Sequence, residues 1–298
     1  MNAVSTRAEP GTPTRGIAVR DLVALTKPRI TLMVILTAAG GLYLAPREVA
    51  PLTVLLTLLA TAMVVGAANT LNCWLERDVD KHMARTKRRP LPAGRMEAKH
   101  ALWLGLALGA ISVPVLTFVA NPLTGLLAAI ALVSYVWVYT PMKQRSPAAL
   151  IVGAVPGALP PLMGWTAATG ELGAPGLVLF GIMFLWQMPH FIAISIFRQR
   201  EYSKAGIKVL PAVRGNTVAK RHAALWAAAL LPVSLLLVPL GIAGGVYLAA
   251  AAILGAAFFG WSLWGLRAEA GNRWARQLFL GSLVYLPLLF AALAFDLA

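Results

Sequence analysis

The sequence predicts an all-α protein that crosses a membrane many times. Hydrophobic residues make up 59% of the 298 residues and charged residues only 12%, and the hydrophobic residues fall into long blocks rather than short alternating runs. A soluble domain usually carries about twice this fraction of charged residues. Long apolar blocks are typical of membrane-spanning helices, each of which needs about 20 mainly apolar residues. We therefore expect a polytopic membrane protein.

Nine blocks are long enough, or nearly so, to cross a bilayer, and each predicts one transmembrane helix. In chain order they are 30–45, 51–75, 101–120, 122–142, 148–170, 176–197, 223–243, 244–266 and 277–295. The first block is short, but the chain from Leu22 onward could extend it. The junctions at Asn121 and around Gly244 are tight, which fits antiparallel helical hairpins.

Basic residues are confined almost entirely to alternate loops. If the N-terminus is cytoplasmic, the segments on the cytoplasmic side hold 25 of the 26 Lys and Arg residues, and only Arg47 lies on the other side. Cytoplasmic loops of membrane proteins carry such an excess of positive charge. We therefore expect a cytoplasmic N-terminus and a C-terminus on the opposite side of the cell inner membrane. Loop position explains the formal net charge of +15 better than nucleic-acid binding does.

The chain outside these blocks is short. Residues 1–20 contain Ser, Thr, Pro, Gly and three arginines without an apolar core, which predicts a disordered cytoplasmic tail rather than a signal peptide. Residues 21–298 are predicted to form a single transmembrane domain, and 16–27 could form an amphipathic helix on the membrane surface. The single cysteine, Cys73, excludes an internal disulfide framework.

A group of polar side chains lies at the cytoplasmic end of the second predicted helix. Asn72, Glu76 and Asp80 are spaced four residues apart, so they should share one helical face. An amide and two carboxylates in a column predict a Mg²⁺ site, because Mg²⁺ is usually held by one or two carboxylates together with water and substrate phosphate. The alternative is a solvated helix end whose acids pair with Arg77, Lys81 or Arg85.

A cationic loop follows this column and predicts an anion site beside it. Arginine suits phosphate oxygens, and acids next to arginines are what a metal-bound diphosphate requires. Ordinary positive-inside charge or attraction to anionic lipid is the alternative. The cations that we expect to hold a diphosphate are Arg85, Arg88 and Arg89 in this loop, and Lys143 and Arg145 after the fourth helix.

A second polar group flanks the cytoplasmic half of the sixth predicted helix. Trp186, Gln187 and His190 lie within the apolar span, and Glu201 follows it. A histidine in a span needs a partner, which is either a neighbouring helix or a bound ligand. Glu201 is either a further metal carboxylate or a partner of Arg200.

At these residues the chain resembles the UbiA superfamily of intramembrane prenyltransferases, and within it the haem O synthase (protohaem IX farnesyltransferase) branch. Asn72, Glu76 and Asp80 occupy the superfamily's Asn-x-x-x-Asp-x-x-x-Asp signature, with Glu76 where Asp is usual. The second acidic motif is reduced to Glu201. Further blocks match the branch: Thr-Lys-Pro-Arg at 26–29, Tyr139-Thr140, Pro160-Pro161-Leu-Met-Gly164-Trp165, Trp186-Gln187-x-Pro189-His190-Phe191 and Glu201-Tyr202-x-x-Ala205-Gly206.

The resemblance implies a reaction, its substrates and its site. Farnesyl would pass from farnesyl diphosphate to a vinyl group of haem B, giving haem O and diphosphate. Mg²⁺ would be the cofactor, with haem A synthase or the cytochrome oxidase assembly pathway as a partner. The residues implied are Asn72, Glu76, Asp80 and Glu201 for the metal, Arg85, Arg88, Arg89, Lys143 and Arg145 for the diphosphate, and Trp186, Gln187 and His190 for haem contact.

Two alternatives of different kinds stay open at the level of sequence. A related prenyltransferase that acts on an aromatic or quinone precursor would share the metal site but not the block around His190. A membrane transporter would need no Mg²⁺, and its acids would more often lie near the bilayer midplane. A CDP-alcohol phosphotransferase is disfavoured because its Asp-Gly-x-x-Ala-Arg motif is absent.

Overall fold

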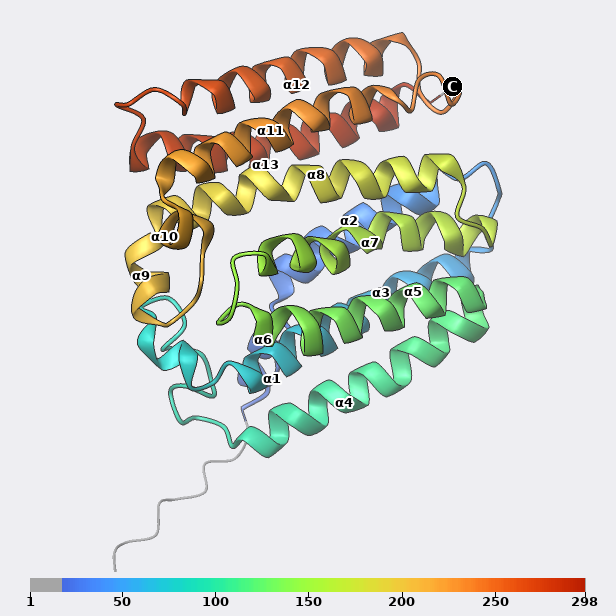
Figure 1. Ribbon diagram of the computed structural model, residues 1–298. Helices are drawn as coiled ribbons and strands as arrows, with labels where there is room; N and C mark the ends of the chain where they lie inside the picture. Colours follow the sequence, from blue (N-terminus) through green and yellow to red (C-terminus); the bar gives the residue numbers. More distant parts are fainter. Residues whose placement is uncertain (1–17, 298) are drawn as a thin grey trace, which may run out of the picture.

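The computed structural model describes residues 18–297, and throughout that range the regular elements are helices without a β-strand (Figure 1). Most of the predicted tail, 1–20, therefore lies outside the described residues. One isolated antiparallel bridge joins Ala243 to Leu297 near the C-terminus. The predicted all-α fold class is confirmed.

The first half of the chain places six α-helices before residue 143, several of them with distorted ends. These elements are α1 Val19–Leu25, α2 Pro28–Tyr43, α3 Pro51–Leu75, the 3-10 turn η1 Val79–His82, α4 Ala98–Val115 continued by the π-helical η2 Leu116–Ala120, and α5 Pro122–Val133 continued by η3 Ser134–Tyr139 and α6 Thr140–Met142. Proline occupies the first turn of α2, α3 and α5, where its missing N–H is not needed.

The second half alternates long helices with two short helices outside the bundle. The elements are α7 Ala149–Thr169, α8 Ala174–Phe197, the short α9 Gln199–Lys204 and α10 Leu210–Arg214, then α11 Asn216–Leu235, α12 Gly245–Trp264 and α13 Asn272–Phe295. Asp296 fixes the C-terminal end of the chain, because its carboxylate accepts a hydrogen bond from Tyr247 N in the first turn of α12.

Seven of these helices are long and apolar enough to cross a membrane, and α1 with α2, bent by 51°, makes an eighth if the pair counts as one span. The remaining predicted span corresponds to α11, whose first turns are polar and contain Lys220 and Arg221. A multi-pass membrane protein is thus confirmed, whereas the count of nine spans stays a prediction.

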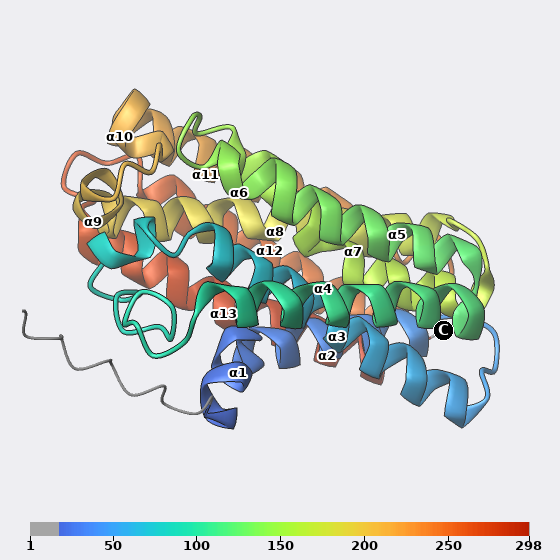
Figure 2. The ribbon, with the colours of Figure 1, turned by 90° about the horizontal axis from the view of Figure 1, so that it is seen from below.

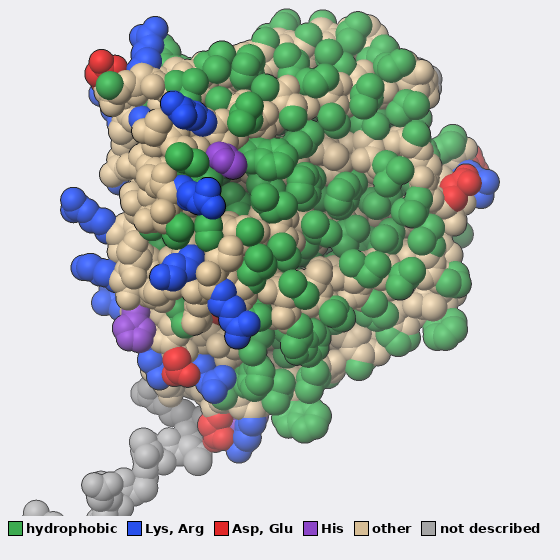
Figure 3. All heavy atoms as spheres, in the orientation of Figure 1, with side chains coloured by type: hydrophobic (Ala, Val, Ile, Leu, Met, Phe, Trp, Pro, Cys, Tyr) green, Lys and Arg blue, Asp and Glu red, His purple; other side chains and the backbone are tan. Residues whose placement is uncertain are grey.

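The long helices run side by side between two ends of the molecule (Figures 1 and 2). The predicted basic loops, including the segment after α3 and the short helices α9 and α10, gather at one end (Figure 1). Lys and Arg side chains cluster at that end, and hydrophobic side chains cover the middle of the same face (Figure 3). An apolar belt with charge at its ends is the surface that a bilayer requires.

Helix α7 lies in the interior and approaches α2 closely. A side chain at Gly164 would overlap the carbonyl oxygen of Ala38, and one at Gly41 would overlap the carbonyl oxygen of Pro161. Small residues at such a crossing let two backbones approach, as is common between membrane helices. This contact holds α2 against the centre of the bundle.

Candidate active site

Asn72, Glu76 and Asp80 remain stacked although α3 ends at Leu75. The backbone keeps helical spacing beyond the helix end, because Glu76 N donates to Asn72 O at 2.9 Å and Asp80 N donates to Glu76 O at 2.8 Å. All three residues are buried, with exposed fractions of 2%, 8% and 0%. The column predicted from the spacing is therefore present, and it faces the interior of the protein.

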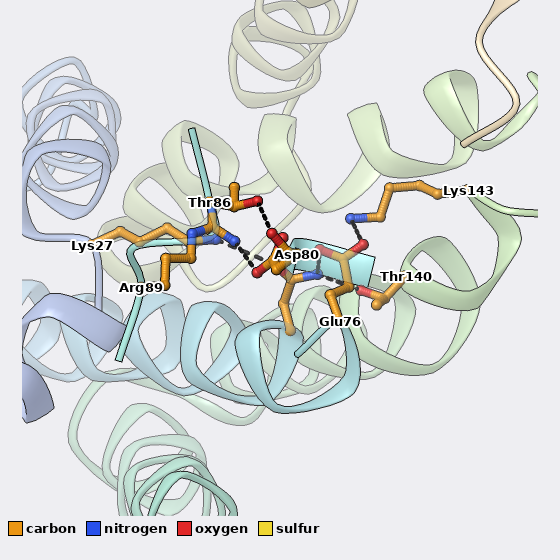
Figure 4. A network of polar contacts seen from close by, with 8 residues as sticks. Lys27, Glu76, Asp80, Thr86, Arg89, Thr140 and Lys143 are labelled. Carbon is orange, nitrogen blue, oxygen red and sulfur yellow. Dashed lines mark hydrogen bonds and ion pairs between the residues drawn. The ribbon is translucent and has the colours of Figure 1, made fainter. Parts of the chain in front are cut away.

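Three cations from separate parts of the chain surround this column (Figure 4). Arg89 binds Asp80 through NH1 and Oδ2 at 2.7 Å. Lys143 forms an ion pair with Glu76. Lys27 donates from Nζ to Asn72 Oδ1 at 3.3 Å. The arrangement is a cluster of opposite charges, with buried carboxylates and half-buried cations, at the cytoplasmic end predicted for α3.

Further hydrogen bonds fix the orientation of these side chains. Asn72 Nδ2 donates to Glu76 Oε2 at 3.0 Å and to Thr140 Oγ1 at 3.1 Å. Thr86 Oγ1 donates to the backbone oxygen of Asp80 at 2.9 Å, which ties the loop after α3 to the column. The ammonium of Lys143 also lies over the Tyr139 ring, 4.6 Å from its centroid, in a cation–π contact.

One oxygen in the cluster lacks a partner. Asp80 Oδ1 is buried and accepts no hydrogen bond from any described residue, which is unusual for a buried polar atom. Within residues 18–297, no three His, Cys, Asp or Glu side chains lie close enough to form a metal site by themselves. Two carboxylates and an amide fit Mg²⁺ that is bound jointly by the protein and a ligand phosphate. Asp80 Oδ1 is the free oxygen of this set.

The five cations predicted for a diphosphate divide into two groups. Arg89 and Lys143 contact the carboxylates directly. Arg85 and Arg88 in the loop after α3, and Arg145 after α6, are exposed. Both loops lie at the same end of the molecule (Figure 1). The second group is positioned to attract anions to the site, and its direct contact with a diphosphate stays a prediction.

Glu201 lies on the short helix α9, outside the column. Its carboxylate pairs with Arg198 at 2.9 Å, not with Arg200, and accepts the backbone N–H of Arg85 at 3.2 Å. Burial alone would raise the pKa of Glu201, but these two hydrogen bonds outweigh it and lower the pKa below the ordinary value. Glu201 also lines an open hollow of about 480 Å³ with Lys81, Lys87 and Lys204. Its role as a metal ligand stays a prediction.

His190 is held by a network between α8 and α13. Ser282 Oγ donates its only hydrogen to Phe279 O at 2.6 Å, so at the 2.7 Å contact with His190 Nδ1 the serine must accept. His190 is therefore protonated at Nδ1 and keeps a lone pair on Nε2. Trp186 stacks on the His190 ring at 4.9 Å and donates from Nε1 to Ser282 O at 2.8 Å.

Gln187 packs differently from its two neighbours. Its amide donates to Ala154 O on α7 at 3.2 Å and to Met183 O at 3.0 Å. It therefore joins α7 to α8, and its predicted contact with haem is not tested by this geometry.

Lys27 is a residue of the site that the sequence reasoning left out. It comes from the link between α1 and α2, far from Asn72 in the chain. The signal in the sequence that could have identified Lys27 is the Thr-Lys-Pro-Arg block at 26–29.

Comparisons with known proteins identify the family of this chain. Residues 33–284 match the UbiA prenyltransferase family. A protein named protoheme IX farnesyltransferase from Anaeromyxobacter sp. (strain Fw109-5) is 57% identical over 274 residues, covering 92% of each chain. The chain belongs to the UbiA prenyltransferase family. A UbiA-family relative with the same name from Myxococcus xanthus (strain DK1622) is 55% identical over 93% of this chain and 94% of its own length.

Solved structures place the chain in the UbiA fold. A structure described as digeranylgeranylglyceryl phosphate synthase superposes with a TM-score of 0.80 at 19% identity, covering 93% of this chain and 97% of the other. A UbiA homolog from Archaeoglobus fulgidus bound to GPP and Mg²⁺ gives a TM-score of 0.65 at 17% identity, covering 92% and 99%. At these identities the likeness concerns the fold alone. The matched UbiA region, 33–284, contains every predicted site residue, whereas Lys27 precedes it.

Proposed function

We propose that this chain transfers the farnesyl group of farnesyl diphosphate to a vinyl group of haem B, giving haem O and diphosphate. The observation that carries prenyl transfer is the buried column of Asn72, Glu76 and Asp80 with its free Asp80 oxygen and its surrounding cations. The choice of haem as acceptor rests on the name and the 57% identity of the relative described above.

The first step breaks the bond between the allylic carbon and the diphosphate oxygen. Both bonding electrons leave with the diphosphate, so negative charge on the leaving group has to be stabilised. Arg89 and Lys143 supply fixed positive charge at the column, and Arg85, Arg88 and Arg145 are proposed to guide and hold the anion. Asn72, Glu76 and Asp80, with Glu201 as a proposed fourth ligand, would hold Mg²⁺, whose charge supports departure of the diphosphate.

The second step forms the new carbon–carbon bond. The vinyl π electrons of haem attack the farnesyl cation, and the resulting cation on the haem side takes up water, which then loses a proton. The apolar interior of the bundle would keep water from the farnesyl cation until the vinyl group has reacted.

His190 is proposed to contact the haem substrate. Its Nε2 lone pair suits haem iron, and Trp186 beside it offers an aromatic face for the macrocycle. Gln187 is retained as a predicted contact. In this arrangement haem is a substrate and not a redox cofactor.

The orientation in the membrane is part of the proposal. With the charged end of Figure 3 in the cytoplasm, all nine predicted spans would cross the inner membrane, the N-terminus would be cytoplasmic and the C-terminus would lie on the opposite side. The location of basic loops at one end supports this orientation. Haem A synthase, or the cytochrome oxidase assembly pathway, would be the partner that receives the product.

The proposed reaction can be tested in membranes that contain the full chain. Membranes are incubated with haem B, labelled farnesyl diphosphate and Mg²⁺, and haems are separated by chromatography. We expect label in haem O. Label in an aromatic or quinone acceptor would contradict the haem assignment, and absence of any prenyl transfer alongside solute uptake would favour the transporter alternative.

A further inference from the structure

We infer that Arg276 binds a propionate carboxylate of the haem substrate; this inference rests on the proposed choice of haem as acceptor. Arg276 lies in the second turn of α13, the helix whose Ser282 contacts His190. The N-terminal end of α13, which carries Arg276, lies at the end of the molecule where α9, α10 and the basic loops gather (Figure 1).

A continuous chain of side-chain contacts leads from His190 to Arg276. The centroid of the His190 ring lies 4.9 Å from that of Phe279, which in turn lies 5.9 Å from the centroid of Phe197. The guanidinium carbon of Arg276 lies 5.8 Å from the Phe197 centroid. Arg276 precedes Phe279 by three residues, which places it about 4.5 Å further along α13 toward the charged end. The proposed iron contact and Arg276 therefore share one surface of α8 and α13.

The surface around His190 suits a flat aromatic ligand. Trp186 stacks on the His190 ring at 4.9 Å, and Phe191 meets its edge at 5.1 Å. Phe191 is exposed, and the rings of Trp186, Phe197 and Phe279 are half-buried. Aromatic rings in such positions offer a large apolar area and favourable contacts to another π system. The rings can therefore receive the plane of a porphyrin.

The chemistry of haem B requires a cation at one edge of this surface. The macrocycle is apolar, but both propionates are ionised at neutral pH, and an ionised carboxylate is costly to place in hydrocarbon. With the macrocycle beside His190, the propionates have to point toward the charged end of the bundle. Arg276 borders the aromatic surface on that side. The vinyl groups are on the opposite half of the macrocycle, so this contact leaves them free to react.

Arg276 is available to such a carboxylate. A second guanidinium, that of Arg198, also lies over the Phe197 ring, at 5.7 Å, but it already pairs with Glu201 at 2.9 Å. Arg276 is exposed and takes part in no ion pair among residues 18–297. A guanidinium binds a carboxylate through two parallel hydrogen bonds. Of the two arginines beside Phe197, Arg276 is therefore the one that a ligand can engage.

Anionic lipid is the other source of an acidic group here, because basic residues at a cytoplasmic interface attract lipid headgroups. Arg267 provides a matched control. It is also exposed, it lies over the ring of Trp264 at 4.9 Å, and within the described part of the chain it likewise forms no ion pair. Arg267 follows α12, outside the aromatic surface around His190. A lipid contact is open to both arginines, and a propionate contact only to Arg276.

The test compares two ligands that differ only in the charge of the propionates. The purified full-length protein in phosphatidylcholine nanodiscs is titrated with haem B and with haem B dimethyl ester, and binding is followed by absorption. We expect Arg276→Gln to bind haem B about tenfold more weakly, as the loss of a hydrogen bond to a charged group predicts, and to bind the ester as the wild type does. Arg267→Gln should bind both ligands normally. Affinity for farnesyl thiodiphosphate, a non-reactive analogue, should not change in either variant.

The alternatives give different results. Equal haem B affinity in Arg276→Gln and the wild type would overturn the inference. So would an equal loss of affinity for haem B and its ester, which indicates a structural role, or a loss that appears only when phosphatidylglycerol is added to the discs, which indicates a lipid contact. Arg276→Lys keeps the positive charge and should prefer haem B over the ester more strongly than Arg276→Gln does; the absence of that difference would also count against the inference. A wild type that binds no haem B would instead refute the proposed acceptor itself.

Discussion

Asp80 is the residue on which the chemistry of the column depends most. One carboxylate oxygen binds Arg89, and the other is buried without a partner among residues 18–297, so this second oxygen is the one available to a metal. Asp80→Asn keeps the size of the side chain and removes its charge. We expect kcat for haem O formation to fall at least about 100-fold, as it does when a group that stabilises a developing charge is lost, while the protein stays inserted and folded.

The control for this substitution is Asp78→Asn in the same segment. Asp78 is exposed and pairs with Lys81 at 2.8 Å, and exposed pairs contribute roughly 0–1 kcal/mol. Its activity should stay close to that of the wild type. Equal loss of activity in both variants would show that the segment tolerates no change, and unchanged activity in Asp80→Asn would remove Asp80 from the metal site.

Ser282 offers a test of the state in which His190 is held. In Ser282→Ala the His190 ring loses its hydrogen-bond acceptor, so its tautomer is no longer fixed. Loss of such a supporting bond typically costs a histidine ligand about 10- to 100-fold in affinity. We expect haem B to bind more weakly by that factor in an absorption titration, with the affinity for farnesyl thiodiphosphate unchanged.

Ser262→Ala serves as the comparison, because Ser262 is also buried and, within the described part of the chain, its hydroxyl bonds only to the carbonyl of Phe258 on its own helix. It should bind haem normally. Equal haem affinity in Ser282→Ala and the wild type would separate His190 from haem recognition.

At the scale of elements, the crossing of α2 and α7 holds α2 against the centre of the bundle. Gly164→Ala would place a methyl group on the carbonyl oxygen of Ala38, and such overpacking typically costs about 1–3 kcal/mol. We therefore expect a lower melting temperature in detergent. Gly281→Ala in α13 meets nothing within 4 Å and should match or exceed the wild type. Similar melting temperatures for the two variants would refute the close crossing.

The elements also show which features a sequence can predict. The second predicted block, 51–75, matches α3 at both ends, because proline marks its start and the apolar run ends at Leu75. The spacing of Asn72, Glu76 and Asp80 predicted their common face because helical hydrogen bonds persist past the helix end. Lys27 could not be assigned in this way, since its contact with Asn72 depends on a left-handed backbone before proline and on the packing of two distant segments.

Other partners were equally beyond prediction from the sequence. Glu201 was expected to pair with Arg200 if it bound no metal, but the start of α9 brings Arg198 to it instead. The acceptor of His190 lies 92 residues away on α13. Local periodicity gives the face on which a side chain lies, and tertiary packing decides which partner meets it.

At the scale of the whole molecule, α11 decides whether the chain has the predicted number of spans. In a Cys73→Ala background, thiols are introduced at Ser203, before α11, and at Leu240, after it; both positions are exposed. In right-side-out vesicles, a reagent that cannot cross the membrane should label Leu240→Cys and leave Ser203→Cys unmodified, because α11 separates them. Labelling of both positions from one side would mean that α11 does not cross.

The central claim is that the column at the end of α3 binds a prenyl diphosphate through a divalent cation. The most direct measurement is a crystal structure of the full chain with farnesyl thiodiphosphate and Mn²⁺ in place of Mg²⁺, in which anomalous scattering locates the ion. We predict an anomalous peak within about 2.3 Å of Asp80 Oδ1, near the usual length of an oxygen–metal bond, with the diphosphate beside Arg89 and Lys143. A diphosphate bound elsewhere, or a peak that does not touch Asp80, would contradict the claim.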